Sequence, residues 1–219
     1  MDAARFIHLS DLHLGRSAQT NAVAAELIDT IAEVGIEHVL VSGDITDHGR
    51  SSELELFWQL AEPIRDRLTL VPGNHDRLGD DLRDAIMPGK RVQVETARGL
   101  YLVRVDSTGP HNRNFLAGHG RLLPEDVDEV EEALSAAPER SLRVVALHHH
   151  PLPLPEDHFV ERISSHFRLP FTEELELGWE LVQAINGKCD LVLHGHRHSA
   201  TAHSIEVNSE RPTWVFNAG

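Results

Sequence analysis

Short apolar runs that end in polar turns recur along the whole chain. They are FIHL at 6–9, HVLVS at 38–42, LTLV at 68–71, GLYLVRV at 99–105, LRVVAL at 142–147 and DLVL at 190–193. Short runs of this kind, rich in β-branched residues and bounded by turn residues, are typical of buried strands. The pattern therefore predicts a chain whose core is built on β-strands.

Helix patterns lie between the early strands. One apolar stripe joins Val23, Leu27, Ile28, Ile31 and Val34, and another joins Leu54, Phe57, Trp58, Leu60 and Ile64. The second stripe begins with Ser52 and Glu55, which have the spacing of a capping box. Further helices are expected at about 124–136 and 173–186, and VQVET at 92–96 should form a hairpin with the GLYLVRV run. Strands that alternate with helices predict an α/β fold with a partly parallel sheet.

Length and charge narrow the class of protein. A chain of 219 residues suits one well-buried domain over 1–219. Its 35 acidic and 20 basic residues give a formal charge of −15, which disfavours a nucleic-acid polymer as the partner. No uninterrupted apolar stretch approaches the ~20 residues of a membrane-spanning helix. The start MDAARFIHLS has no apolar signal segment and Cys189 is the only cysteine, so we expect a cytoplasmic protein.

Residues of the kinds that bind metals follow five of the expected strands. The candidate ligands are Asp11, His13, Asp44, Asn74, His149, His196 and His198. The carboxyl ends of strands in an open α/β sheet form the edge where ligands bind. Side chains two apart on a strand point the same way, so Asp11 should share a side with His13, and His196 with His198. This oxygen and nitrogen donor set without a thiolate suits manganese, iron or zinc.

The order of these motifs, D-x-H, G-D, G-N-H-D, H-H-P and G-H-x-H, resembles the calcineurin-like metallophosphoesterase superfamily across residues 6–217. The stretches SGDITDHG and HHHPLP are similar to the bacterial cyclic-nucleotide and glycerophosphodiester phosphodiesterase group. The resemblance implies a four-layer α/β/β/α sandwich of two mixed sheets with a two-metal centre between them.

The resemblance also implies roles for the candidate ligands. Asp11, His13 and His198 would bind the first metal, Asn74, His149 and His196 would bind the second, and Asp44 would bridge the two. Family members usually place the first histidine of H-H-P on the metal, which points to His149. His148 would then face the opposite side of its strand.

The expected chemistry is hydrolysis of a phosphoester. Two metals roughly 3.5 to 4 Å apart lower the pKa of a shared water, and the resulting metal-bridging hydroxide is the expected nucleophile. His75 should protonate the leaving alkoxide while Asp76 holds the imidazole. A bracing role for His75 within its turn is the alternative.

Substrate contacts are expected from Arg113, Arg162 and Arg168, because a guanidinium can grip two phosphate oxygens, and from His150, which could line the pocket. Solvated arginines, and a His150 that only caps the turn before Pro151, are the alternatives. The segment 152–171 contains Phe159, Phe167 and Phe171 and could form a wall over the metals or pack on its own domain. The expected substrate is a small phosphodiester, such as a cyclic nucleotide or a glycerophosphodiester. The alternatives are a phosphomonoesterase or protein phosphatase, then a nuclease, and finally a scaffold protein without catalysis.

Overall fold

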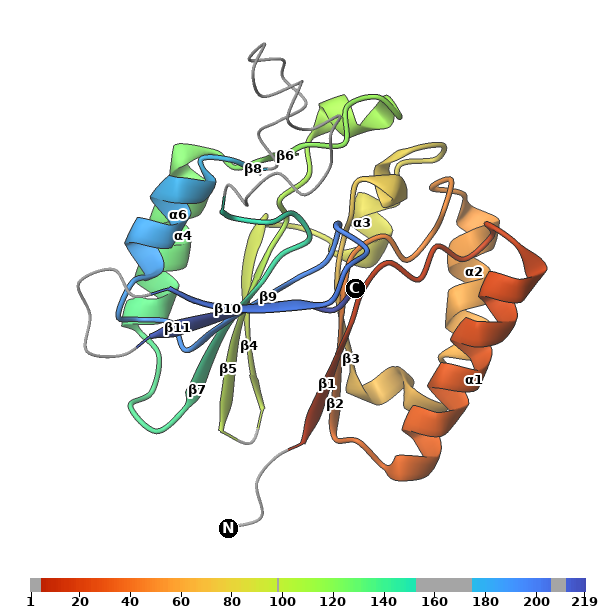
Figure 1. Ribbon diagram of the computed structural model, residues 1–219, viewed down its shortest axis with the longest axis horizontal. Helices are drawn as coiled ribbons and strands as arrows, with labels where there is room; N and C mark the ends of the chain where they lie inside the picture. Colours follow the sequence, from red (N-terminus) through yellow and green to blue (C-terminus); the bar gives the residue numbers. More distant parts are fainter. Residues whose placement is uncertain (1–4, 98, 153–174, 206–211) are drawn as a thin grey trace.

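Two β-sheets pack face to face at the centre of the protein, and helices cover their outer faces (Figure 1). The computed structural model describes residues 5–97, 99–152, 175–205 and 212–219. The smaller sheet contains three parallel strands in the order β1 (Phe6–Leu9), β2 (His38–Ser42) and β3 (Leu68–Val71). Because these strands are parallel, the motifs that follow them lie at one edge of the sheet.

The larger sheet is mixed and has the strand order β10, β11, β9, β7, β5, β4. Its strands are β4 (Val92–Ala97), β5 (Leu100–Val105), β7 (Leu142–Ala146), β9 (Leu191–His194), β10 (Thr201–Ile205) and β11 (Thr213–Asn217). The inner strands are parallel, whereas β4 and β10 at the two sides run antiparallel to their neighbours. The predicted hairpin is confirmed as β4 and β5. A short parallel pair joins β6 (Gly120–Arg121) to β8 (Leu175–Glu176).

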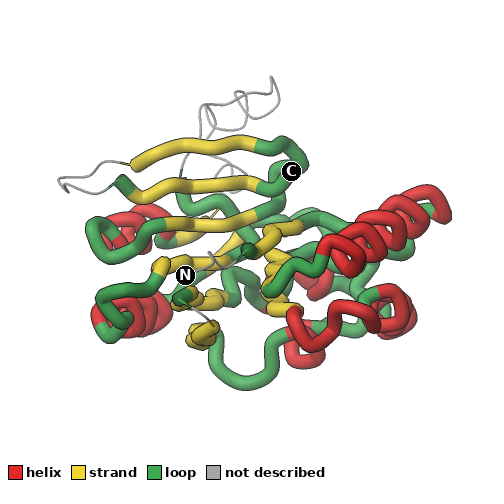
Figure 2. Tube along the Cα trace, turned by 90° about the horizontal axis from the view of Figure 1, so that it is seen from below, coloured by secondary structure: helices red, strands yellow, loops and turns green. Residues whose placement is uncertain are grey.

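The helices form the two outer layers (Figures 1 and 2). α1 (Ala18–Val34) and α2 (Ser51–Leu60) cover the smaller sheet, and α4 (Pro124–Ser135) and α6 (Gly178–Ile185) cover the larger one. The shorter elements are α3 (Arg83–Ile86) and the 3-10 helices η1 (Glu62–Arg67), η2 (His75–Arg77) and η3 (Pro110–Arg113). α6 begins at Gly178, later than the expected residue 173, because residues 175–176 form β8. Over the described ranges, none of the helices has both the length and the apolar character that crossing a membrane requires.

Three clusters of buried apolar side chains lie between the layers of the fold. Ile28 and Phe57 pack between the helices and the smaller sheet, and Leu40 packs near Leu102 between the two sheets. Leu181 belongs to the third cluster, under α4 and α6. Complete burial of a side chain of this size contributes about 1.5–3 kcal/mol to stability. The predicted four-layer α/β/β/α sandwich is confirmed, with a smaller sheet that is parallel rather than mixed.

The start of α2 differs from the prediction. The helix begins at Ser51, so Ser52 lies inside its first turn instead of capping it. The Glu53 carboxylate accepts hydrogen bonds from the N–H groups of His48 (2.9 Å) and Arg50 (3.3 Å). Because an acid in the first turn already binds these free N–H groups, the predicted capping box of Ser52 and Glu55 is wrong, although the helix itself is confirmed.

Candidate metal centre

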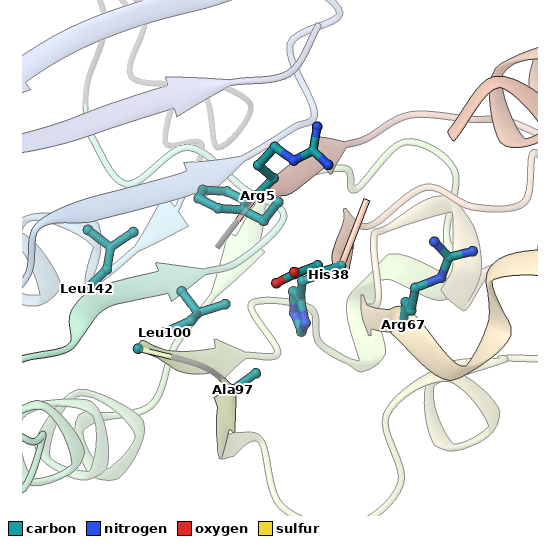
Figure 3. A pocket seen from close by; sticks show the side chains of 9 residues that line it. Arg5, His38, Arg67, Ala97, Leu100 and Leu142 are labelled. Carbon is teal, nitrogen blue, oxygen red and sulfur yellow. The ribbon is translucent and has the colours of Figure 1, made fainter. Parts of the chain in front are cut away.

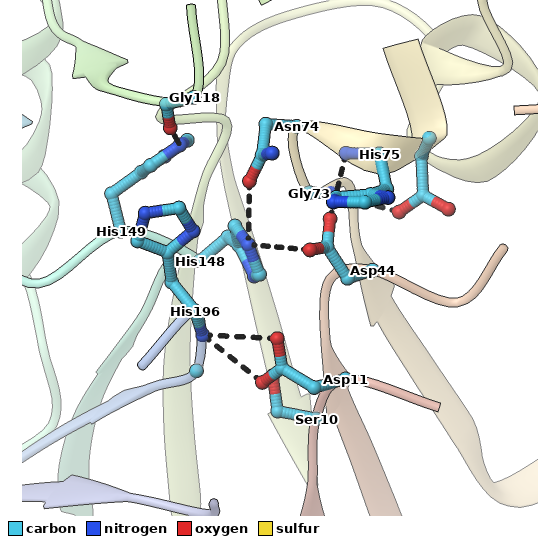
Figure 4. Close-up of polar contacts among 12 residues, drawn as sticks. Ser10, Asp11, Asp44, Gly73, Asn74, His75, Gly118, His148, His149 and His196 are labelled. Carbon is cyan, nitrogen blue, oxygen red and sulfur yellow. Dashed lines mark hydrogen bonds and ion pairs between the residues drawn. The ribbon is translucent and has the colours of Figure 1, made fainter. Parts of the chain in front are cut away.

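The loops after β1, β2, β3, β7 and β9 meet around the Asp44 carboxylate (Figure 4). Asp44 is 1% exposed. Its Oδ2 lies 3.8 Å from His13 Nε2 and 3.4 Å from His148 Nε2, so one carboxylate faces imidazoles from both sheets. Its Oδ1 accepts a hydrogen bond from the backbone N–H of His75 at 2.8 Å. Burial raises the pKa of Asp44, but the adjacent His148 outweighs it and holds that pKa well below the usual range.

A first group of donor atoms gathers on one side of Asp44. It contains Asp11, His13, Asp44 and His198, with one donor atom of each within 4.8 Å of the others. His198 Nε2 lies 3.2 Å from His13 Nε2 and 3.4 Å from Asp11 Oδ1. Two imidazole nitrogens and two carboxylates that converge in this way fit a divalent cation of the manganese, iron or zinc type.

A second group gathers on the other side and contains His148, His149 and His196. Asn74 Oδ1 lies 3.1 Å from His148 Nε2. His148 Nδ1 donates to the carbonyl of Ser42 at 2.8 Å, so the neutral ring directs the Nε2 lone pair at the oxygens of Asn74 and Asp44. A cation held by these three atoms would resolve the clash of lone pairs. Although burial lowers its pKa, the Asp44 carboxylate raises the pKa of His148 to about 9.

The expectation that His148 faces away from the metals is therefore wrong. His149, the ligand expected from the H-H-P pattern, has partners for both ring nitrogens. Its Nε2 donates to the carbonyl of Gly118 at 3.0 Å, and its Nδ1 accepts from the hydroxyl of Ser107 at 2.8 Å. Since β7 ends at Ala146, the alternation of a strand does not set the directions of these two rings. The hydrogen bonds favour His148 as the ligand and His149 as a ring that anchors a neighbouring loop.

Left-handed backbone, not strand alternation, brings the ligand candidates together. β1 ends at Leu9 and β9 at His194, so both D-x-H and H-x-H lie beyond their strands. Positive φ angles occur at Asp11 (57°), His13 (44°), Asp44 (50°), His196 (74°) and His198 (50°). Such conformations cost about 1–3 kcal/mol each away from glycine and cluster at functional sites. The expected geometry of alternating side chains is therefore wrong: Asp11 and His13 share a donor group, whereas His196 and His198 belong to different groups.

Glycine is required at two motif positions because neighbouring side chains leave no room for a Cβ. A Cβ on Gly195 would overlap the side chains of Ser10 and Asp11, and a Cβ on Gly73 would overlap the carboxylate of Asp44. The glycines let the loops of the two sheets approach each other until their ligand side chains meet.

His75 lies at the rim of the centre, and its ring packs edge-on against His13 with 4.6 Å between ring centroids. Its Nδ1 donates to the carbonyl of Asp47 at 2.8 Å, which leaves Nε2 as the nitrogen that could exchange a proton with a substrate. The carboxylate of the same Asp47 lies 3.0 Å from His13 Nδ1. Asp47 thus supports both rings, a role that we did not predict although the residue belongs to SGDITDHG.

The predicted contact between Asp76 and the His75 imidazole is wrong. Asp76 is fully buried, and its carboxylate accepts hydrogen bonds from the N–H groups of Ile45, Thr46 and Gly73 and from the Thr46 hydroxyl. Burial and the nearby Asp44 raise the pKa of Asp76 to about 6. Asp76 joins the loop after β2 to the loop after β3, so it has a bracing role.

Of the four residues predicted to contact the substrate, the structure describes Arg113 and His150. Arg113 pairs with Asp81 at 2.6 Å, and its side chain is largely exposed. His150 is fully buried, with Nδ1 2.9 Å from His194 Nε2, so its ring lies in the interior and not on a substrate surface. Arg162, Arg168 and the proposed wall at 152–171, apart from residue 152, lie outside the described residues.

A cavity of about 510 Å³ lies at the opposite edge of the sheets, where strands begin (Figure 3). Its lining includes Arg5, His38, Arg67, Ala97, Leu100 and Leu142. This lining contains none of the candidate ligands, so the cavity is separate from the metal centre.

Adjacent alanine substitutions will decide between His148 and His149. Both side chains are fully buried and the truncation is the same size, so the variants are matched. We expect His148→Ala to lower the bound metal from two ions to about one per chain, because it removes a ligand. His149→Ala should keep both ions, because both its ring nitrogens bind protein groups. Elemental analysis of folded protein is the measurement, and metal loss in His149→Ala alone would restore the assignment from the H-H-P pattern.

Residues 4–200 match the calcineurin-like phosphoesterase family. The 3',5'-cyclic adenosine monophosphate phosphodiesterase CpdA of Vibrio vulnificus is 24% identical over 164 residues, which cover 69% of this chain and 57% of that protein. The glycerophosphodiester phosphodiesterase GpdQ of Enterobacter lignolyticus is 33% identical over 132 residues, which cover 53% of this chain and 42% of that protein. The chain thus spans about half the length of these two relatives.

The fold is shared with a solved structure, a dimetal phosphatase of Danio rerio. The TM-score is 0.67 at 9% identity, and the alignment covers 97% of this chain and 86% of the other. Identity this low shows a common fold and nothing finer. Because the family match extends over most of the sequence, including all five motifs up to His198, the chain belongs to the calcineurin-like phosphoesterase family.

Proposed function

We propose that this chain hydrolyses small phosphodiesters with two metal ions held between its sheets. The observation that carries the proposal is the buried Asp44 carboxylate, which faces His13 on one side and His148 on the other. Asp11, His13 and His198 would hold one ion, and Asn74, His148 and His196 the other, with Asp44 between them. This assignment keeps six of the seven ligands expected from the sequence and replaces His149 by its neighbour.

The donor set suits manganese, iron or zinc. Two bound cations would lower the pKa of a water and neutralise charge on the phosphoryl oxygens. The contribution of the chain itself is to fix the ligands and to supply a proton. His75 has its Nδ1 proton committed to the Asp47 carbonyl, so we assign the proton that the leaving group needs to His75 Nε2. Asp76 joins the loops after β2 and β3 and takes no part in proton transfer.

The proposed substrate class is a phosphodiester, either a cyclic nucleotide or a glycerophosphodiester. The names of the two relatives support it, and so do the charges around the site. A monoester dianion carries more charge than a diester and needs more cationic groups beside it. Arg77 is buried against Asp81, and Arg113 pairs with the same carboxylate, so both guanidiniums are held by the protein and one of their two charges is offset.

We expect kcat/KM for bis(p-nitrophenyl) phosphate to exceed that for p-nitrophenyl phosphate by at least about tenfold at equal metal loading, which is about 1.4 kcal/mol of transition-state discrimination. Both substrates release the same nitrophenolate, so the comparison isolates the charge and the second substituent. A cyclic nucleotide and a glycerophosphodiester then separate the two substrate candidates. A tenfold preference for the monoester would contradict the proposal and favour the phosphatase alternative.

We also propose that residues 1–219 form a single domain, that the protein is cytoplasmic, and that it has no membrane or nucleic-acid partner. The ligand side chains at all five motifs argue against a scaffold protein without catalysis.

A further inference from the structure

Two large apolar side chains stand exposed on the loop between η3 and β6. Phe115 is 71% exposed and Leu116 is 72% exposed. The Phe115 ring rests edge-on against His75, with 5.8 Å between ring centroids. His75 in turn packs against His13, so one intervening ring separates Phe115 from a candidate metal ligand.

The loop that presents Phe115 is held by its own polar contacts. Asn112 is 1% exposed; its Oδ1 accepts from Gly109 N–H at 2.7 Å, and its Nδ2 donates to the carbonyls of Ala117 (2.7 Å) and His119 (3.0 Å). The rings of His111 and His119 stack with centroids 4.3 Å apart. A buried asparagine with these partners fixes both ends of the loop, so the exposure of Phe115 is a property of an ordered structure.

The same loop is joined to the candidate metal centre. The Gly118 carbonyl accepts the hydrogen bond from His149 Nε2 at 3.0 Å (Figure 4). A Cβ on Gly118 would lie 3.7 Å from Asn74 Nδ2 and 3.8 Å from His196 Cε1. The backbone three residues from Phe115 therefore lies beside two of the ligands proposed above, which places the loop next to the candidate metal centre.

An aromatic ring that is held beside a candidate active site and is largely exposed can stack on a planar group of a ligand. The Phe115 and His75 rings are nearly perpendicular, with 81° between their planes, and the exposed part of the Phe115 ring leaves room for a planar group. Stacking a nucleic acid base on an aromatic side chain contributes about 1–3 kcal/mol and tolerates any base, because every base has a π face. An alkyl substituent such as glycerol gains no stacking from the same ring.

We propose that Phe115 is a specificity-determining residue that stacks on the base of a nucleotide substrate. The proposal rests on the function proposed above and narrows it to cyclic nucleotides over glycerophosphodiesters. Phe115 acts on substrate binding, whereas His75 beneath it acts on the leaving group.

The test compares Phe115→Ala, Phe115→Tyr and Leu116→Ala as metal-loaded proteins. Leu116→Ala is the matched control, since Leu116 has the same exposure on the same loop and no aromatic ring. With a cyclic nucleotide, Phe115→Ala should raise KM roughly tenfold and leave kcat within about twofold. With a glycerophosphodiester, the same variant should match the wild type. Phe115→Tyr keeps the ring and should keep the wild-type KM for both substrates. Leu116→Ala should leave the KM of both substrates unchanged.

An equal loss for both diesters in Phe115→Ala, or a loss of the same size in Leu116→Ala, would overturn the stacking role. No change for the cyclic nucleotide would also overturn it. The proposed function fails separately, if the wild type turns over only monoesters. In that case p-nitrophenyl phosphate and glycerol phosphate replace the diester pair, and a KM increase confined to the aryl ester would still support Phe115.

Discussion

Asp44→Ala should lose most of its bound metal and all measurable phosphoester hydrolysis. The Asp44 carboxylate faces imidazoles of both donor groups, with Oδ2 3.8 Å from His13 Nε2 and 3.4 Å from His148 Nε2. Its removal would leave two cations repelling each other across a gap with no negative charge between them, an uncompensated cost in a buried site. Both losses should therefore appear together, in elemental analysis and in turnover of bis(p-nitrophenyl) phosphate.

The control for this variant is Asp126→Ala. Asp126 is also a buried acid, but it lies at the start of α4, where it pairs with Arg91 at 2.9 Å and accepts the N–H of Leu123. Asp126→Ala should lower thermal stability and retain both metal ions. Two ions per chain and near-normal turnover in Asp44→Ala would show that Asp44 does not join the two sites.

The large-scale fold could be predicted because its signals are local and repeated. Every apolar run named from the sequence forms a strand within one residue of the expected bounds. Parallel strands bring their carboxyl ends to one edge, so Asp11, His13, Asp44 and His198 converge as expected. This convergence follows from the direction of the strands and does not depend on the directions of individual side chains.

The predictions for the site were wrong where they depended on the direction of a side chain. Alternation ends with the strand, and the positive φ angles at Asp11, His13 and Asp44 turn the side chains in directions that no periodicity encodes. Asp76 follows His75 in the chain, yet its carboxylate turns to Thr46 and the His75 ring turns to a backbone carbonyl of Asp47. A hydrogen bond to a backbone carbonyl cannot be predicted from the pattern of side-chain types.

The roles of His148 and His149 in the histidine triple also depend on contacts that the sequence pattern does not encode. His148 and His149 are chemically identical, and their roles are set by partners from distant parts of the chain. Ser42 binds Nδ1 of the first and thereby exposes its Nε2 to the site. Ser107 and Gly118 occupy both nitrogens of the second. Only the three-dimensional contacts distinguish them.

His75→Ala should separate catalysis from metal binding. The backbone N–H of His75 holds Asp44 Oδ1 at 2.8 Å, and this hydrogen bond survives truncation of the side chain. Metal content should therefore stay near two ions per chain, while kcat for an alkyl diester falls by roughly 10²- to 10⁴-fold, the usual contribution of a positioned acid or base. His38→Ala at the opposite edge of the sheets, in the lining of the separate cavity, is the matched histidine control and should leave kcat unchanged.

The dependence on the leaving group then identifies what His75 does. An alkoxide needs a proton as it departs, whereas nitrophenolate is stable enough to leave with little help, so the loss in His75→Ala should be much smaller for bis(p-nitrophenyl) phosphate than for an alkyl diester. The ring also supports Phe115 and His13 by edge contacts, and loss of that support would affect every substrate alike. His75→Phe keeps a ring of similar size without a titratable nitrogen. If it restores the rate with alkyl diesters, His75 acts by packing; if the rate stays low while the metal content is normal, the proton on Nε2 is the contribution of the residue.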